Sequence, residues 1–376
     1  MAEFYEFFAG GGMARAGLGP HWTCRFANDH DTKKAASYKA NWGKDHLLVD
    51  DVAKVSIEHL TGHVDLAWAS FPCQDLSLAG SRAGLQGERS GTFWPFWRLM
   101  QGLAEEGRAP RMIVLENVPG LITSAGGDDF CELGKAIAAL GYRLGAMVID
   151  AVHFVPQSRQ RLFVIAVAPG IEIPAAITRS DPSGFWHPRA LVEAKFKLPK
   201  FVQDQWLWWN IPAPPTRDQV FSDLIEETPT GVQWNSDADT QALINMMSLV
   251  NKAKVSAART AGTRRVGALY RRTREGIQRA EVRFDDVAGC LRTPGGGSSR
   301  QSILVVEQGT VKSRLLSPRE AARLMGLPDD YVLPEKYNDA YHLMGDGLVV
   351  PVIAYLEHHI LSPILQVIAA VPAAAA

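Results

Sequence analysis

The stretch Phe7-Phe8-Ala9-Gly10-Gly11-Gly12-Met13-Ala14-Arg15-Ala16-Gly17 joins an apolar run at 3–8 to a segment with helical spacing. The run predicts a strand, and the glycines predict a turn whose backbone a ligand can approach closely. Asp29 follows Gly10 by nineteen residues, the spacing of a carboxylate that holds ribose hydroxyls. The turn lacks the Lys and Ser or Thr of a phosphate-binding loop. Taken alone, the turn is compatible with a nucleoside cofactor site or with a plain tight turn.

Apolar runs and helical segments alternate over the first 170 residues. Further strands are expected at 23–27, 64–69, 112–116, 142–149 and 161–168, and helices at 35–41, 92–106 and 130–140. This alternation predicts an α/β fold with a doubly wound, mostly parallel sheet that is covered on both faces. Ligands of such sheets bind at the carboxyl ends of the strands.

The pattern changes after about residue 170. Residues 181–232 are rich in Pro and Trp without a clear period, and a helix is expected at 238–254. Helices are also expected at 317–325, where Ser317-Pro318 is a typical start, and at 349–369, which is apolar enough to be buried. The middle region therefore predicts a smaller, irregular second domain.

Composition excludes several protein classes. The 376 residues are 47% hydrophobic and 21% charged, which is typical of globular proteins rather than disordered ones. We expect no membrane span and no signal peptide, and hence a cytoplasmic protein. The four cysteines form no Cys-x-x-Cys pair and the ten histidines show no metal-ligand spacing, so we expect neither a disulfide framework nor a metal.

The charge distribution is uneven. The net charge is −1, yet residues 252–300 hold twelve Lys and Arg against four Asp and Glu, so the rest of the chain sums to −9. A neutral protein with one strongly basic segment can bind a polyanion locally. A solvated basic face is the alternative.

Three further motifs carry reactive side chains near the expected ligand edge. Cys73 follows the strand at 64–69 and is either a nucleophile or an inert thiol, and the glycine-rich stretch 79–91 behind it can form a lid. Glu116 ends the strand at 112–116, where partial burial would raise its pKa and suit a general acid; a capping carboxylate is the alternative. Arg159 and Arg161 stand at the head of the next strand, and we expect them to point to opposite faces, one into the site.

Four motifs follow one another in the chain, namely Phe8/Gly10/Gly12, Pro72-Cys73-Gln74, Glu116-Asn117-Val118 and Gln157/Arg159/Arg161. Together they resemble the Phe-x-Gly-x-Gly, Pro-Cys-Gln, Glu-Asn-Val and Gln-x-Arg-x-Arg motifs of the cytosine carbon-5 DNA methyltransferases of bacteria and phages. Segments 290–296, 314–331 and 345–352 are similar to that family's recognition core and its last two motifs. The resemblance spans nearly the whole chain.

The resemblance implies an S-adenosylmethionine-dependent methyltransferase fold, with S-adenosylhomocysteine as product and no metal. It implies a catalytic and cofactor domain at 1–180, a target-recognition domain at 181–335 and a C-terminal segment at 336–376 that returns to the first domain. It implies cofactor contacts for Phe8, Gly10, Gly12, Asp29, His30, Asp51, Val52, Pro72, Phe93, Asp346 and Leu348. Three residues depart from the family pattern: Asp346 replaces Asn, His30 replaces an aromatic residue, and Met13 replaces Gly.

The resemblance also implies a mechanism. Cys73 would add to carbon 6 of a cytosine flipped out of duplex DNA, Glu116 would protonate nitrogen 3, and the methyl group would go to carbon 5. Arg159, Arg161 and Asn117 would complete the catalytic set. DNA contacts are expected from Gln74, Ser77, Arg82, Arg271, Arg272, Arg292 and Arg300. We expect a monomer, and a cognate restriction enzyme is a further suggested partner.

Three other functions compete with this one. An RNA-directed relative is disfavoured because Asp75-Leu76-Ser77, rather than Pro-Phe-Thr, follows Pro-Cys-Gln. A non-catalytic nucleic-acid-binding relative is disfavoured by the presence of Cys73, Glu116 and Arg161. A nicotinamide-dependent oxidoreductase is disfavoured by the short glycine loop.

Overall fold

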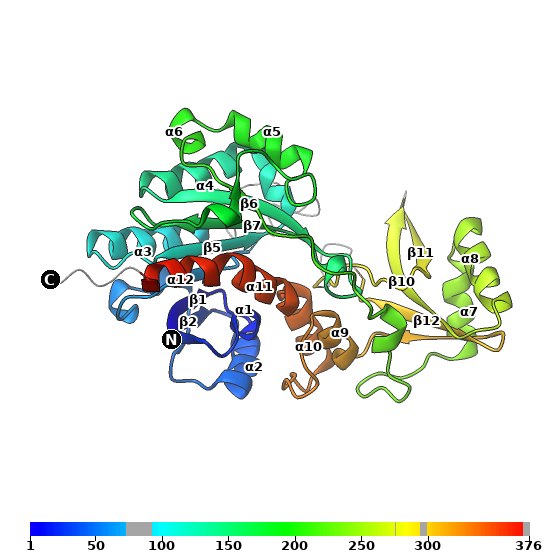
Figure 1. Cartoon of the computed structure of the whole chain (residues 1–376). Helices are drawn as coiled ribbons and strands as arrows, with labels where there is room; N and C mark the ends of the chain where they lie inside the picture. Colours follow the sequence, from blue (N-terminus) through cyan, green and yellow to red (C-terminus); the bar gives the residue numbers. More distant parts are fainter. Residues whose placement is uncertain (73–91, 275, 294–298, 371–376) are drawn as a thin grey trace. The chain divides into compact units, whose positions relative to one another are not determined.

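The computed structural model describes residues 1–72, 92–274, 276–293 and 299–370, which form two units (Figure 1). Unit 1 comprises Met1–Ile149, Gln160–Ala213 and Val352–Ala376, and unit 2 comprises Asp150–Arg159 and Pro214–Pro351. Residues 181–213, which we expected in the second domain, belong to unit 1. The reason is backbone pairing with a strand of unit 1, since Leu144 N donates to Gln205 O (3.0 Å) and Leu207 N donates to Leu144 O (2.7 Å).

Unit 1 is built on a seven-stranded sheet of order β3-β2-β1-β4-β5-β7-β6. The strands are β1 (Ala2–Phe7), β2 (Trp22–Asp29), β3 (Leu47–Val49), β4 (Leu66–Ala69), β5 (Met112–Asn117), β6 (Arg143–Asp150) and β7 (Gln160–Val167). The pairs from β3 to β5 are parallel, and β7 is antiparallel to β5. This confirms the predicted doubly wound, mostly parallel sheet. β3 was not predicted, because three half-buried residues give no periodic signal.

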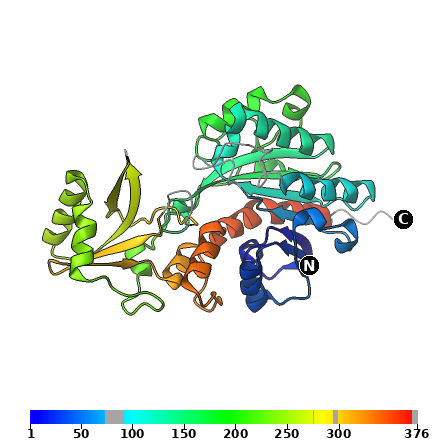
Figure 2. The same ribbon diagram turned by 180° about the vertical axis from the view of Figure 1, so that it is seen from behind.

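Helices cover the sheet on both faces (Figures 1 and 2). Those in unit 1 are α1 (Met13–Leu18), α2 (Thr32–Trp42), α3 (Phe93–Glu105), α4 (Asp128–Ala139), α5 (Arg189–Lys197), α6 (Lys200–Gln203) and α12 (Ser362–Ala370), beside a short hairpin of β8 (Thr178–Arg179) and β9 (Trp208–Trp209). Phe96, Trp97 and Met100 of α3 pack with Tyr5 and Phe7 of β1 in one large core. The carboxyl ends of the parallel strands form the edge at which we expect ligands to bind.

The C-terminal helices form a long apolar segment. Tyr337–Ala370, which includes α10 (Tyr337–Asp346), α11 (Val350–Leu356) and α12, is long and apolar enough to cross a membrane, and an 18-residue stretch within it has a mean hydropathy of 1.5. We expected no such run. Only the part from Val352 onward belongs to unit 1, and Ile353, Leu356 and Ile360 are completely buried there.

Unit 2 contains a four-stranded antiparallel sheet of order β11-β10-β12-β13. Its elements are α7 (Asp237–Asn245), α8 (Leu249–Thr260), β10 (Arg265–Arg274), β11 (Ile277–Arg283), β12 (Ser302–Glu307), β13 (Thr310–Leu315) and α9 (Pro318–Leu324). Part of the basic stretch 252–300 is therefore regular, since α8 holds its start and the β10–β11 hairpin its middle. The single helix expected at 238–254 is two helices, because Ser248 caps α8 through Asn251 N.

Candidate functional site

The glycine turn after β1 has an unusual backbone. Phe8, Gly10 and Gly12 all have positive φ, at 58°, 56° and 77°. A Cβ on Gly12 would collide with the Trp42 ring and lie 3.0 Å from Tyr38 Cε2, whereas a Cβ on Gly10 would meet no atom within 4 Å. Gly12 is therefore needed for packing against α2, and the space over Gly10 is open to a ligand.

Asp29 holds this turn from the end of β2. Its Oδ2 accepts from Gly10 N at 2.7 Å, and its Oδ1 accepts from Asp31 N at 2.8 Å. The side chain is buried, whereas that of His30 is 72% exposed. Each carboxylate oxygen keeps a lone pair for a further donor, so Asp29 can order the turn and still accept a hydroxyl.

The parallel register brings the other expected cofactor residues of unit 1 to the same edge. Asn28 pairs with Phe7 on one side and Leu48 on the other, and its Nδ2 donates to Asp50 O at 2.9 Å. Asp51 follows and caps a short 3₁₀ turn through Ala53 N at 2.8 Å, with Val52 buried behind it. The ends of β1, β2 and β3 thus meet around the glycine turn.

Phe93 and Pro72 lie around the end of β4. Phe93 begins α3 and is completely buried, with its ring 5.4 Å from Phe71 and stacked on Trp97 at 5.7 Å. Pro72 is half-buried. Cys73, Gln74, Ser77, Arg82 and the expected lid at 79–91 lie outside the described residues.

The acid and the arginine meet at the β5–β7 pair. Arg161 Nε lies 3.0 Å from Glu116 Oε1, and Glu116 is 7% exposed. Antiparallel pairing of Asn117 with Leu162 produces this contact, since it brings the end of β5 to the start of β7. The guanidinium compensates the charge of the carboxylate at this buried position. Glu116 and Arg161 therefore form an ion pair, and Glu116 is not an isolated acid.

Asn117 connects this pair to the segment that leads into Cys73. Its Nδ2 donates to Phe71 O at 3.2 Å, and its Oδ1 accepts from Val118 N at 2.8 Å. The side chain is buried. Asn117 thus fixes the backbone of Phe71, two residues before the expected nucleophile.

Arg159 does not resemble a substrate-facing side chain. It is 2% exposed and donates to Leu291 O (2.8 Å), Gly345 O (3.0 Å) and Gly347 O (2.6 Å), all within unit 2. The expectation of opposite faces was poorly founded, because residues two apart in a strand share a face. The two arginines differ because Arg159 precedes β7, whereas Arg161 lies in it. A cation at the end of α10 is well placed to stabilise that helix.

The segment 290–293 packs against the same end of α10. Thr293 Oγ1 donates to Asp346 Oδ1, and a Cβ on Gly345 would lie only 2.6 Å from Thr293 N. Leu348, two residues after Asp346, is buried. Asp346 therefore supports Arg292-Thr293, and its role toward a cofactor stays a prediction, as does that of Leu348.

The remaining expected DNA-contacting arginines lie in different settings. Arg272 is half exposed on β10, and the register puts its neighbour Arg271 on the opposite face of the hairpin. Arg300 donates to Asn338 Oδ1 at 2.6 Å and lies over the Tyr337 ring. Arg271 and Arg272 therefore lie on opposite faces of the hairpin, and their contacts with DNA stay predictions.

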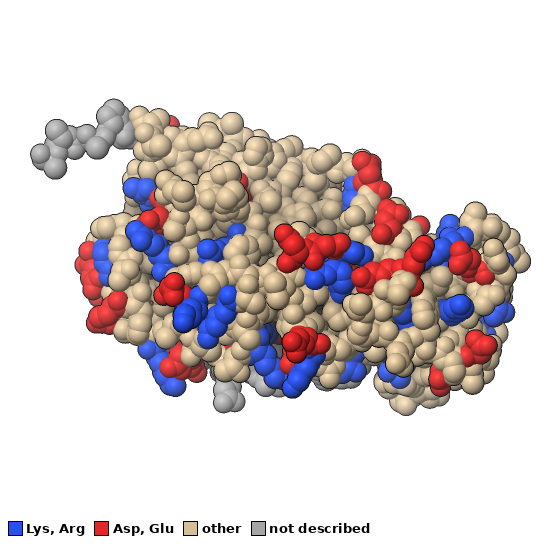
Figure 3. Space-filling view, turned by 90° about the horizontal axis from the view of Figure 1, so that it is seen from below, with Lys and Arg blue, Asp and Glu red and all other residues tan. Residues whose placement is uncertain are grey.

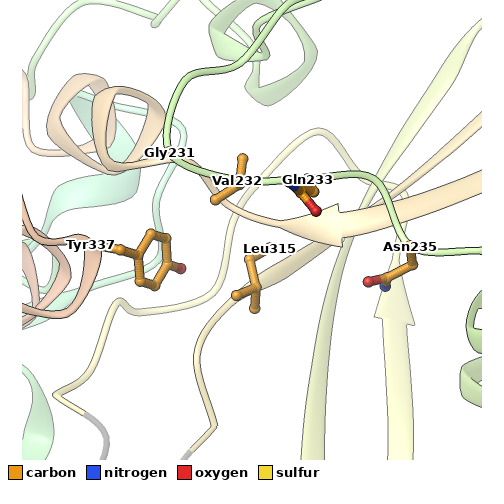
Figure 4. A pocket seen from close by; sticks show the side chains of 6 residues that line it. All are labelled: Gly231, Val232, Gln233, Asn235, Leu315 and Tyr337. Atoms are coloured by element: carbon orange, nitrogen blue, oxygen red, sulfur yellow. The ribbon is translucent and has the colours of Figure 1, made fainter.

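A cavity of about 560 Å³ lies in unit 2 (Figure 4). Its wall consists of Gly231, Val232, Gln233, Asn235, Leu315 and Tyr337. None of the residues expected to bind cofactor or base lines it. Asn235 Nδ2 already donates to Ser313 Oγ, and Tyr337 Oη donates to Leu316 O, so these polar groups are occupied by the protein itself.

Sequence reasoning missed Glu6, which lies beneath the glycine turn. It is 1% exposed in β1, its Oε1 accepts from Arg15 N at 3.4 Å, and burial raises its pKa to about 8. Arg15 follows the N-cap Gly12, which has no side chain to cap α1. Glu6 thus supplies a capping acceptor from the strand. A charged residue inside an apolar run was the signal that could have revealed it.

A family model described as C-5 cytosine-specific DNA methylase matches residues 2–362. The chain belongs to this family. It is 24% identical to Type II methyltransferase M.MspI of Moraxella sp over 95% of this chain and 70% of that protein. It is 25% identical to Type II methyltransferase M.HhaI of Haemophilus parahaemolyticus over 95% of this chain and 94% of that one.

Solved structures agree on the fold. The chain has a TM-score of 0.65 to the Entamoeba histolytica methyltransferase EhMeth at 14% identity, covering 96% of this chain and 97% of that one. For Schizosaccharomyces pombe Dnmt2 the TM-score is 0.59 at 16% identity, covering 96% and 99%. As a C-5 cytosine-specific DNA methylase, the protein is an enzyme that methylates cytosine in DNA, and its family and fold imply S-adenosylmethionine as donor.

Proposed function

We propose that this methylase transfers a methyl group from S-adenosylmethionine to carbon 5 of a cytosine flipped out of duplex DNA, through a covalent adduct of Cys73. The observation that carries the proposal is the contact between Glu116 and Arg161 beside Asn117, which holds the backbone just before Cys73. An acid, a cation and a nucleophile are the groups that this chemistry requires.

The Cys73 thiolate forms a bond to carbon 6, and the electrons of the 5,6 double bond move toward carbon 5. A proton on nitrogen 3 from Glu116 neutralises the developing negative charge. The methyl group would then pass to carbon 5, with S-adenosylhomocysteine as the leaving product, and the proton of that carbon would be lost to water or another base. The bond between Cys73 and carbon 6 then breaks, nitrogen 3 returns its proton to Glu116, and both the double bond and the thiolate are restored.

Glu116 and Arg161 must rearrange when the base enters. Arg161 would turn to donate to the oxygen on carbon 2, which would remove its stabilisation of the carboxylate. Glu116 would then gain a proton more easily, in a site from which the base excludes water. Asn117 positions the base and the nucleophile segment. Arg159 we assign as a positioning residue, because its guanidinium is occupied by carbonyl oxygens.

The donor fits the glycine turn, because the open space over Gly10 lies beside the Asp29 carboxylate. S-Adenosylmethionine supplies an electrophilic methyl group when bound. We propose that Asp29 and Asp51 accept from its hydroxyl and amine groups. The other proposed contacts are Phe8, Gly10, Gly12, His30, Val52, Pro72, Phe93, Asp346 and Leu348.

Access to carbon 6 requires that the nucleotide rotate out of the duplex, at a cost of a few kcal/mol. We propose that Gln74, Ser77 and Arg82 act near the flipped base, and that Arg272, Arg292 and Arg300 contact the duplex. Salt-sensitive binding follows, because phosphate contacts release counterions. We further propose a monomer that acts in the cytoplasm and, as the names of its type II relatives suggest, is accompanied by a restriction enzyme.

The test uses labelled S-adenosylmethionine with duplex DNA or transfer RNA. We expect label in DNA with the wild type and none with Cys73→Ala. A duplex containing 5-fluorocytosine, which cannot lose its carbon-5 substituent, should become covalently attached to the wild type. Label in RNA alone would refute the DNA substrate, and equal attachment to Cys73→Ala would refute the nucleophile.

A further inference from the structure

The β10–β11 hairpin of unit 2 places two arginines directly opposite each other. In its antiparallel register Arg272 pairs with Arg279, and Arg271 pairs with Ala280. Since side chains alternate between the faces of a strand, Arg272 and Arg279 share one face and Arg271 lies on the other. On the face of the molecule shown in Figure 3, basic and acidic residues are mixed. The charge of that face therefore indicates an anion-binding site less clearly than two arginines directly opposite each other do.

The two faces of the hairpin have different surroundings. Leu269, Ala280 and Val282 pack in the core with Val255 and Ala258 of α8, so the face of Arg271 is the one that α8 covers. On the other face, a Cβ on Gly289 would lie 4.0 Å from the ring of Tyr270. The segment that leads to Arg292 therefore starts on the same face as Arg272 and Arg279.

Like charges directly opposite each other destabilise a sheet. Arg272 is partly compensated, because its guanidinium lies 4.6 Å from the Tyr270 ring centre and its Nε lies 3.9 Å from Glu281 Oε2. Arg279 is exposed, and within the described residues its side chain has neither an ion pair nor a hydrogen bond. Within the described residues, the contacts of Arg272 offset this repulsion only in part, and a bound anion would offset it further.

We infer that Arg272 and Arg279 together bind one backbone phosphate of the DNA substrate. Two facing guanidinium groups can donate several hydrogen bonds to phosphate oxygens, and the phosphate neutralises the repulsion between them. Contacts of this kind fix the register of a protein on the duplex without reading its sequence. The inference rests on the proposed function, because that function supplies duplex DNA as the partner.

The experiment measures the affinity of the full chain for duplex DNA between 50 and 200 mM NaCl. We expect Arg279→Gln to weaken binding and to reduce the slope of log K against log salt, by at most the value of about 0.9 for one lost phosphate contact, because Arg272 still faces the phosphate. Arg272→Gln should behave alike. Arg271→Gln removes the same charge from the opposite face and should keep the wild-type slope.

Thermal melting without DNA provides the second readout. Arg279→Gln should melt at the same or a higher temperature than the wild type, because it removes a repulsion; a structural role for Arg279 predicts a lower temperature. A wild-type slope in Arg279→Gln, or an equal loss in Arg271→Gln, would overturn the inference. If the wild type fails to methylate DNA while Arg279→Gln still lowers the slope, the phosphate site stands and the proposed function falls.

Discussion

Glu6 shows how one side chain can link the sheet to the glycine turn. It is buried in β1, and its Oε2 has no hydrogen-bond partner among the described residues. Desolvation is the main cause of its raised pKa, with Asp29 adding repulsion and Arg15 and Tyr38 opposing it. The Arg15 guanidinium donates to His46 Nε2 at 2.6 Å, so its positive charge does not act on Glu6 alone. A buried acid of this kind is protonated at neutral pH.

We predict that Glu6→Gln stabilises the protein in a pH-dependent way. The folded pKa is about 8 against 4.5 for an ordinary glutamate, so the folded state binds the extra proton between these values. Wild-type stability therefore falls as pH rises from about 4.5 to about 8. The variant lacks this loss and should gain up to about 3–5 kcal/mol relative to the wild type between pH 5 and pH 9.

Urea denaturation at several pH values measures this difference. Glu3→Gln in the same strand is the control, because Glu3 is partly exposed and pairs with Arg25, and it should show no comparable gain at high pH. A difference between Glu6→Gln and wild type that stays constant from pH 5 to pH 9 would show that Glu6 ionises normally.

At the scale of the element, the turn between β1 and α1 has a backbone with positive φ and open space over Gly10. Gly10 and Gly43 both have positive φ, and neither would bring a Cβ within 4 Å of another atom. They differ in place, since Gly10 lies in the turn beside Asp29 and Gly43 ends α2. An alanine at either position carries similar backbone strain, of about 1–2 kcal/mol.

We predict that Gly10→Ala and Gly43→Ala lose similar stability but differ in cofactor affinity. A methyl group over Gly10 would occupy the space proposed for S-adenosylmethionine, so Gly10→Ala should weaken its binding at least tenfold. Gly43→Ala should bind like the wild type. Calorimetric titration measures both affinities, and equal affinities for the two variants would place the cofactor elsewhere.

The sequence predicted most elements of unit 1 because its strands are continuous apolar runs buried on both faces. It failed in unit 2, where Arg271, Arg272 and Arg279 stand on both faces of the outer hairpin and hide the alternation of Leu269, Ala280 and Val282. The motifs predicted that Glu116 and Arg161 belong to one site, and in the structure their side chains lie 3.0 Å apart. The burial of Arg159 could not be predicted, because its partners are backbone carbonyls that leave no trace in side-chain identity.

At the scale of the whole molecule, each of the two units contains a hydrophobic cluster of its own, and the tryptophans are divided unevenly between the units. Nine of the ten tryptophans belong to unit 1, and Trp234 alone belongs to unit 2. Tryptophan fluorescence therefore follows mainly the unfolding of unit 1, whereas calorimetry follows both units. Trp234→Phe leaves fluorescence from unit 1 alone.

We predict that S-adenosylhomocysteine raises the unfolding temperatures of both units. At 100 times its dissociation constant a ligand adds about 2.7 kcal/mol, which corresponds to roughly 5–10 °C for units of this size. Unit 1 should shift because it holds Asp29 and Asp51, and unit 2 should shift because Asp346 and Leu348 are proposed contacts. Calorimetry of the full chain, with the fluorescence transition of Trp234→Phe marking unit 1, separates the two effects. A shift confined to unit 1 would remove Asp346 and Leu348 from the cofactor site, and no shift in unit 1 would remove the glycine turn.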